Sequence, residues 1–324
     1  MLCFKRFILH DSLACLYLGS TSKCDLRASE VIMKIGVIGI GVMGEPIARN
    51  LQKAGMSVNV YCRTPATRHA LEESGITAAD SAMQAIQASD MTILLVPSGQ
   101  EVDQVLERDA SGCIPFSLSG KTIILMATVA PCYSQALANA VIAAGGCYIE
   151  APVSGSRKPA ETGQLVILAA APHEAWIAAA MPVFDAIGKK TVRCGAVPTA
   201  MRMKLVNQLL LIATFEAISE ATHFARASGL DVNLFLEMAL AGPLANDVLR
   251  MKAPKLLADD FGQQAPIRHV FKDISLVCEE AQQRGLWLPI ALANRELFGQ
   301  AMQRGQANED AIGIIQVLRN KVAP

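Results

Sequence analysis

The chain has 324 residues, of which 52% are hydrophobic, and this is enough for a sizeable core divided between two domains. Its 29 basic residues balance 29 acidic ones, which argues against nucleic acid or an acidic membrane as the main partner and favours a small molecule. Nine cysteines are scattered without a C-x-x-C pair or a histidine cluster, so we predict reduced thiols in the cytoplasm and no metal site.

Residues 1–32 lack the hydrophobic pattern of the rest of the chain, and Met33 stands immediately before the first predicted strand. We therefore expect this extension to lie outside the fold and to be dispensable. Lys5 and Arg6 precede some apolar residues, as in a signal peptide, but polar residues interrupt these and no clean cleavage site comes after them. No later segment has the uninterrupted apolar length of a membrane span.

The first predicted element is a buried strand, because residues 35–40 are almost all apolar. Glycines follow in the order G-x-G-x-x-G, before a helix predicted over residues 46–54. In this pattern the first glycine permits a tight turn, the second lets backbone approach a pyrophosphate, and the third allows close helix packing. A purely structural turn is the alternative. The pattern predicts dinucleotide contacts from Gly39, Ile40, Gly41, Val42, Met43 and Gly44.

The second strand, predicted over residues 57–61, ends in Cys62, Arg63 and Thr64. An acid that binds the adenosine ribose normally stands here, and its absence leaves room for a 2′-phosphate. Arg63 and Arg68 can supply charge and planar hydrogen bonds to that phosphate. The sequence thus favours NADPH over NADH, with NAD still possible. The alternative is that both arginines are ordinary surface charges.

Further apolar runs alternate with helical segments, which is typical of a doubly wound parallel sheet. The runs at residues 91–96 and 121–128 end at the predicted cofactor crevice. Val96, Pro97, Glu101 and Thr128 are therefore expected to contact the cofactor. Additional strands are predicted at 147–149, 165–169 and 191–192, and helices at 67–74, 102–107 and 134–144. Together these elements predict a Rossmann domain over residues 33–196.

Beyond Gly195 long segments with helical spacing replace the strands, and we predict an all-helical domain over residues 197–324. Its first helix, over residues 200–228, repeats apolar residues at three- and four-residue intervals and ends before Gly229. The apolar character of this half suggests a subunit interface. Further helices are predicted at 232–241, 246–258, 271–284, 289–304 and 310–321.

Four separated motifs resemble the β-hydroxyacid dehydrogenase family and together cover nearly all of residues 33–321. They are GIGVMGEPIARNLQKAG at 39–55, EAPVSGSRKPAETGQLVIL at 150–168, MKLVNQ at 203–208 and FKDISL at 271–276. Within the family, CRT at 62–64 is similar to the NADP-using branch, and AGPLANDVLRMKAP at 241–254 resembles tartronate semialdehyde reductases.

The resemblance implies a Rossmann-type α/β domain followed by an all-α domain, in a homodimer or homotetramer. It also implies that NADPH reduces a small carboxylate-bearing aldehyde to the hydroxyacid. The candidate aldehydes are tartronate semialdehyde (2-hydroxy-3-oxopropionate), glyoxylate and succinic semialdehyde. Sequence does not rank them, because one methylene or hydroxyl changes affinity for an apolar pocket by only about 1–3 kcal/mol.

Lys204 matches the family's catalytic lysine, and residue chemistry gives it the same role. Gln208 lies four residues further on the same helical face and can orient the ammonium. Burial against Met203 and Leu205 would lower the pKa of Lys204 toward the range useful for proton transfer. A surface lysine is the alternative.

The resemblance also assigns residues that bind the substrate and approach the cofactor. Lys272 is expected near the nicotinamide, with Asp273 fixing that lysine or its helix. The family's usual Ser-Gly-Gly is Ser-Gly-Ser here, a turn whose hydroxyls and amides can hold a carboxylate. The predicted substrate contacts are Ser154, Gly155, Ser156, Asn207 and Gln208.

Three other functions remain open from the sequence alone. An NAD-dependent 3-hydroxyisobutyrate dehydrogenase is the first, although the Cys62-Arg63-Thr64 strand end argues against it. A catalytically silent cofactor-binding protein of the same fold is the second, although such a protein has no need of Lys204. An imine reductase is a further, related possibility, but such enzymes usually place another residue at this lysine.

Overall fold

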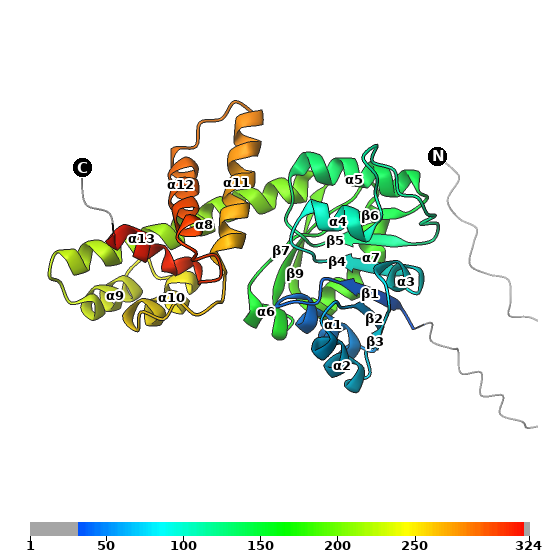
Figure 1. Ribbon diagram of the computed structural model, residues 1–324, viewed down its shortest axis with the longest axis horizontal. Coiled ribbons are helices and arrows are strands. Elements are labelled where there is room, and N and C mark those ends of the chain that lie inside the picture. The colour runs from blue at the N-terminus through cyan, green and yellow to red at the C-terminus, as the bar shows by residue number, and fades with distance from the viewer. Residues whose placement is uncertain (1–31, 321–324) are drawn as a thin grey trace, which may run out of the picture. The chain divides into compact units, whose positions relative to one another are not determined.

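A computed structural model describes residues 32–320 of the chain. Within these residues a sheet covered by helices is followed by a purely helical part (Figure 1), as the fold class predicted from sequence requires. The N-terminal extension up to residue 31 and the predicted helix end at Lys321 lie outside the described residues. Nowhere in residues 32–320 is a helix long and apolar enough to cross a membrane.

The sheet has nine strands in the order β3-β2-β1-β4-β5-β6-β8-β7, with β9 paired to β8. From β1 the chain moves outward to β2 and β3 and then returns to β4 on the other side of β1. The order therefore reverses between β1 and β4, where α/β sheets of this kind bind ligands. The strands are β1 Lys34–Ile38, β2 Ser57–Tyr61, β3 Thr77–Ala78, β4 Met91–Leu94, β5 Thr122–Leu125, β6 Cys147–Glu150, β7 Val153–Ser154, β8 Leu165–Ala170 and β9 Gly188–Gly195.

The prediction of a parallel sheet is correct for β1 to β6 and wrong where β8 joins the sheet. Strand β8 runs antiparallel to both β6 and β7, whereas β9 is parallel to β8. The segment between β7 and β8 is shorter than the dozen or so residues that a parallel crossover requires, so the chain turns back on itself. This return brings Ser154 opposite Val166.

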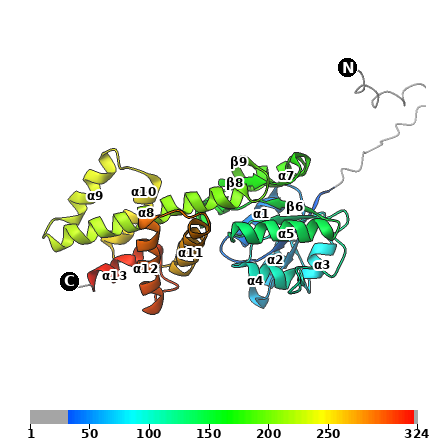
Figure 2. The same ribbon diagram turned by 90° about the horizontal axis from the view of Figure 1, so that it is seen from above.

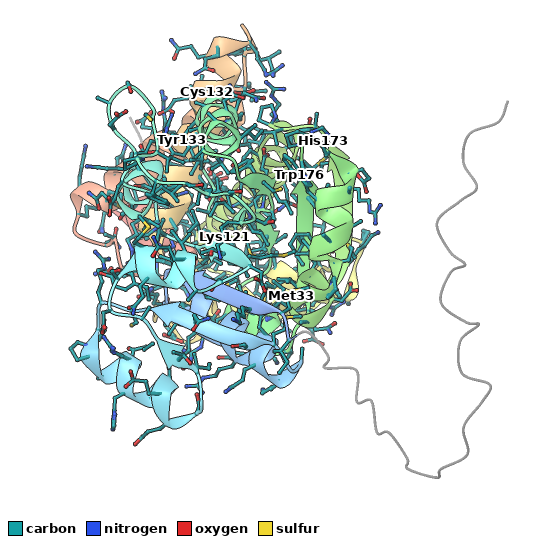
Figure 3. All side chains as sticks on the ribbon, turned by 90° about the vertical axis from the view of Figure 1, so that its right-hand side faces the viewer. Met33, Lys121, Cys132, Tyr133, His173 and Trp176 are labelled. Atoms are coloured by element: carbon teal, nitrogen blue, oxygen red, sulfur yellow. The ribbon has the colours of Figure 1, made fainter. Side chains whose placement is uncertain are left out.

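Helices cover both faces of the sheet and bury two apolar clusters against it. Ile47, Leu51 and Phe184 pack on one face, and Val102 and Leu137 pack on the other. At the N-terminus of α7 (Glu174–Ile187), the rings of His173 and Trp176 pack edge to face. Their centroids are 4.7 Å apart, and Figure 3 labels both residues. The helices are α1 Gly44–Lys53, α2 Pro65–Glu73, α3 Ala82–Gln87, α4 Gly99–Val105, α5 Pro131–Ala143, α6 Arg157–Glu161 and α7 Glu174–Ile187.

Helix α8 organises the C-terminal part. Its first turns pack against β8 and β9, and the rest of it contacts the other helices of this part (Figures 1 and 2). It ends before Gly229, whose φ of +72° suits a residue without a side chain. The helices are α8 Thr199–Ala227, α9 Val232–Ala241, α10 Asp247–Leu257, α11 Ile267–Gln283, α12 Pro289–Gln303, the 3₁₀ helix η1 Ala311–Ile314 and α13 Ile315–Arg319.

Candidate active site

The glycine turn between β1 and α1 has the shape that a dinucleotide phosphate needs. Gly39 has a φ of +101°, and a Cβ there would lie 2.4 Å from the carbonyl oxygen of Leu95. A Cβ on Gly44 would lie 2.1 Å from the Gly39 oxygen, so neither position tolerates a side chain. A Cβ on Gly41 would meet no described atom within 4 Å. The turn is thus tight on its protein side and open at Gly41, which fits a bound pyrophosphate at the start of α1.

The two arginines after β2 are in different environments. Arg68 lies 3.1 Å from the Glu72 carboxylate and 2.9 Å from the Asp80 carboxylate, and these hydrogen bonds raise its pKa. Arg63 is exposed and has no carboxylate partner among residues 32–320. The guanidinium of Arg63 is therefore the freer of the two for an added phosphate.

A buried polar network joins α8 to α11. The ammonium of Lys204 donates to the side-chain oxygen of Gln208 at 2.9 Å, and the amide nitrogen of Gln208 donates to Oδ2 of Asp273 at 2.5 Å. All three side chains are buried. Because a carboxylate only accepts hydrogen bonds, Asp273 fixes the orientation of the Gln208 amide, which then presents its oxygen to Lys204.

Lys272 ties this network to the carboxyl edge of the sheet. Its ammonium donates to the carbonyl oxygen of Thr128 at 2.6 Å, just beyond the end of β5. The same ammonium lies 2.9 Å from Oδ1 of Asp273, although that oxygen has no hydrogen bond of good geometry. Strand β5 is the neighbour of β4, so Lys272 lies one strand from the point where the sheet order reverses.

The pKa of Lys204 is lowered, chiefly because burial disfavours the charged ammonium. The Asp273 carboxylate acts in the opposite direction, and the Lys272 ammonium lowers the pKa further. Of the flanking residues, Leu205 is buried, but Met203 is 46% exposed and does not cover the lysine as expected. Lys204 is therefore a lysine that gives up its proton more readily than a surface lysine does.

Ser154 is the last residue of β7, and Gly155 and Ser156 form the turn from it into α6. Gly155 has a φ of +131°, and a Cβ there would lie 2.8 Å from the Leu165 side chain, so the turn requires glycine. The two serine hydroxyls form no hydrogen bond with residues 32–320 and remain available to a ligand. Val166, opposite Ser154, belongs to the apolar cluster against which the first turn of α8 packs.

Two family models together match most of the chain. The NAD binding domain of 6-phosphogluconate dehydrogenase matches residues 34–195. The NAD-binding domain of NADP-dependent 3-hydroxyisobutyrate dehydrogenase matches residues 199–318.

Individual proteins of the same kind are also similar to this chain over most of its length. Glyoxylate/succinic semialdehyde reductase 1 of Arabidopsis thaliana is 31% identical over 89% of this chain and 99% of its own. The chain belongs to the 3-hydroxyisobutyrate dehydrogenase-like family of β-hydroxyacid dehydrogenases. In the same family, 2-hydroxy-3-oxopropionate reductase of Escherichia coli is 31% identical over 88% of this chain and 97% of its own. The solved 3-hydroxyisobutyrate dehydrogenase of Salmonella typhimurium superposes with a TM-score of 0.80 at 25% identity, covering 88% of this chain and 99% of its own.

Membership confirms the family predicted from the four motifs and makes the protein an oxidoreductase that acts on CH–OH groups with a nicotinamide cofactor. Of the remaining predicted contacts, Val96 and Pro97 follow β4, and Glu101 lies in the first turn of α4, where the Ser98 hydroxyl donates to it. Asn207 is exposed, and the structure does not bring it into the Lys204 network.

Two buried acids of this family member make more contacts in the structure than was predicted from the sequence. Asp273 was expected only to fix Lys272 or its helix, yet it is the acceptor that orients Gln208. Glu150 was not singled out, although it is completely buried at the end of β6. Each acid stands within an otherwise apolar buried pattern, such as Val270 and Ile274 around Asp273, and that interruption was the available signal.

Proposed function

We propose that this family member is an NADPH-dependent reductase of small carboxylate-bearing aldehydes, such as tartronate semialdehyde, glyoxylate and succinic semialdehyde. The observation that most directly supports this proposal is the continuous chain of polar contacts from Lys204 to the carboxyl edge of β5. It passes through Gln208, Asp273 and Lys272. The reductases that share 31% identity with this chain support the same substrate class.

Reduction of an aldehyde requires a proton at the carbonyl oxygen as hydride reaches the carbon. A nicotinamide cofactor supplies the hydride when bound at the glycine turn. The Lys204 ammonium donates the proton, while the Gln208 oxygen holds it by the 2.9 Å hydrogen bond. Because burial lowers the pKa of Lys204, the transfer is easier than from an ordinary lysine.

The substrate carboxylate is assigned to the turn after β7. Ser154 and Ser156 offer two hydroxyl donors there, and Gly155 keeps the backbone free of a side chain. This turn contacts the strand against which α8 begins, which supports a site shared between it and Lys204. The sequence-based assignment of Ser154, Gly155 and Ser156 to the substrate therefore stands as part of the proposal.

A panel of small aldehydes, assayed by NADPH consumption, tests the proposed function. The highest kcat/KM should belong to an aldehyde with a carboxylate, and each such substrate should exceed its uncharged analogue of equal length. Preferred oxidation of 3-hydroxyisobutyrate with NAD would instead support the first alternative function. If no substrate reacts with either cofactor, the remaining hypothesis is a catalytically silent cofactor-binding protein.

Replacement of Arg63 with alanine should raise the KM for NADPH about tenfold, because a charge-assisted bond to the 2′-phosphate is lost. The KM for NADH should hardly change. Steady-state kinetics with both cofactors at saturating aldehyde measure this difference. Arg68→Ala is the matched comparison, since the ion pairs of Arg68 with Glu72 and Asp80 give it a structural role. Equal losses for both cofactors in Arg63→Ala would contradict the assignment.

We extend the proposal to a homo-oligomer in the cytoplasm. Helix α8 carries exposed apolar side chains on the face opposite its buried stripe, including Val206, Leu210 and Phe224, with exposed fractions of 66%, 70% and 70%. Leu234 and Met238 of α9 are exposed to a similar extent. A second copy of the chain is the proposed cover for this surface. The six cysteines of the described residues are free, which suits a reducing compartment.

A further inference from the structure

Glu150 links three elements through one buried carboxylate. It stands at the end of β6, and its side chain is completely buried. One oxygen accepts the backbone N–H of Met201 in the first turn of α8. The other accepts the hydroxyl of Ser134 from α5 at 3.1 Å, and Ser134 is itself 2.7 Å from the hydroxyl of Tyr148.

Helix α8 has no cap of its own at this end. Its N-cap residue is Pro198, which supplies no side-chain acceptor, and its first turn contains no acidic residue. The first N–H groups of a helix are left without internal partners and carry partial positive charge. Glu150 is therefore the group that gives this helix both an acceptor and a negative charge, from a strand distant in sequence.

We propose that Glu150 is a positioning residue, which holds the first turn of α8, and with it Lys204, in the reactive position while its carboxylate is charged. Lys204 follows Met201 by three residues, within one helical turn. A shift of the first turn therefore moves Lys204 relative to the sheet edge where Lys272 meets Thr128. This inference rests on the proton-donor role proposed for Lys204.

The charge on Glu150 changes near neutrality. Burial raises the pKa of Glu150 to about 7, against the Met201 N–H, the Ser134 hydroxyl and Arg202, all of which lower it. The other titratable groups that face it are Tyr148 on the same strand and Cys194 on β9, and both have raised pKa values. Above this pKa the bond to Met201 is charge-assisted, and below it the bond is a weaker neutral one.

The expected consequence is an acid limb in the rate of aldehyde reduction. As the pH falls through about 7, kcat should fall, even though a lower pH favours the protonated, proton-donating form of Lys204. Glu150→Gln mimics the neutral acid, so its kcat at pH 8 should be about tenfold below wild type, since a charge-assisted bond is roughly twice as strong as a neutral one. The acid limb should be absent from this variant, and its KM for NADPH should be unchanged.

Stability separates positioning from a structural role. Because the folded-state pKa of Glu150 is raised above 4.5, ionisation of Glu150 lowers the free energy of unfolding. This loss of stability grows as the pH rises from 4.5 to about 7 and is constant at higher pH. At pH 8 the Tm of Glu150→Gln should therefore equal or exceed that of wild type. Glu150→Asp keeps the charge and should retain the acid limb.

Ser134→Ala provides a second variant, should Glu150→Gln fail to fold. The Ser134 hydroxyl lowers the pKa of Glu150, so its removal should move the acid limb to higher pH. Hydrogen exchange of the peptide containing residues 199–206 tests the hydrogen bond between Glu150 and Met201 without any substrate. Exchange at pH 8 should be faster in Glu150→Gln than in wild type.

The experiment compares wild type, Glu150→Gln and Ser134→Ala by kcat–pH profiles and by hydrogen exchange. A Glu150→Gln variant with wild-type kcat, or with the acid limb intact, would overturn the inference. So would unchanged exchange of residues 199–206. If wild type reduces no aldehyde, the proposed function fails, while the exchange result still decides whether Glu150 holds α8.

Discussion

Replacing Lys204 with alanine should lower kcat for aldehyde reduction by about 10²–10⁴, the usual contribution of a positioned general acid. The ammonium is buried, and its only hydrogen bond to a described residue is the 2.9 Å bond to Gln208, so two of its three protons are free for a substrate oxygen. Stopped-flow or steady-state NADPH oxidation measures the loss.

The affinity for NADPH should remain near wild type in Lys204→Ala, because the glycine turn and Arg63 lie on the other part of the chain. Fluorescence titration of the cofactor checks this. Lys204→Arg should not restore kcat fully, since the guanidinium is bulkier and does not give up its proton. Lys190→Ala, at an exposed lysine of β9, is the matched control and should have wild-type activity. If Lys204→Ala keeps most of its kcat, proton donation must be reassigned, with Lys272 as the next candidate.

The second large effect should come from Asp273→Asn, which keeps the size of the side chain but removes its charge. An asparagine can donate to Gln208, so the Gln208 amide is free to invert and present its NH₂ group to the Lys204 ammonium. Two donors then face each other in a buried place, and kcat should fall by about 10- to 100-fold.

The same substitution should change the pH dependence. Asp273 raises the pKa of Lys204 and Lys272 lowers it, so without the carboxylate the pKa of Lys204 falls further. The alkaline decline of the reduction rate should therefore move to lower pH in Asp273→Asn. Asp260→Asn, at an acid near the protein surface that pairs with Lys255, serves as the control. An Asp273→Asn variant with wild-type kcat and pH profile would show that the Gln208 orientation does not matter.

Local sequence patterns predicted much of this fold, because the glycine turn and the helices are determined by residues that are close in sequence. The glycines at 39, 41 and 44 identified the turn, and apolar spacing located α8 and gave the bounds of α9. Short elements such as β3 and α6 were missed, since two to five residues are too few for a period to show. The antiparallel return of β8 depends on loop length and pairing, which periodicity does not report.

The site was predictable only where its residues share one element. The four-residue spacing of Lys204 and Gln208 forecast their contact, and the structure contains it. Asp273 reaches Gln208 from 65 residues away, and Glu150 reaches Met201 from 51 residues away in the opposite direction along the chain. Such pairs depend on how separate elements pack, as does the contact of Arg68 with Asp80, which lies 12 residues further along the chain.

The pH dependence of kcat/KM for aldehyde reduction, in wild type and in Lys204→Ala, tests the central claim most directly. A general acid must be protonated, so the wild-type rate should decline as the pH rises through the lowered pKa of Lys204, below the 10.5 of an ordinary lysine. In Lys204→Ala that decline should vanish and leave a low, flat profile. The same alkaline decline in both proteins would contradict the account, because another group would then supply the proton.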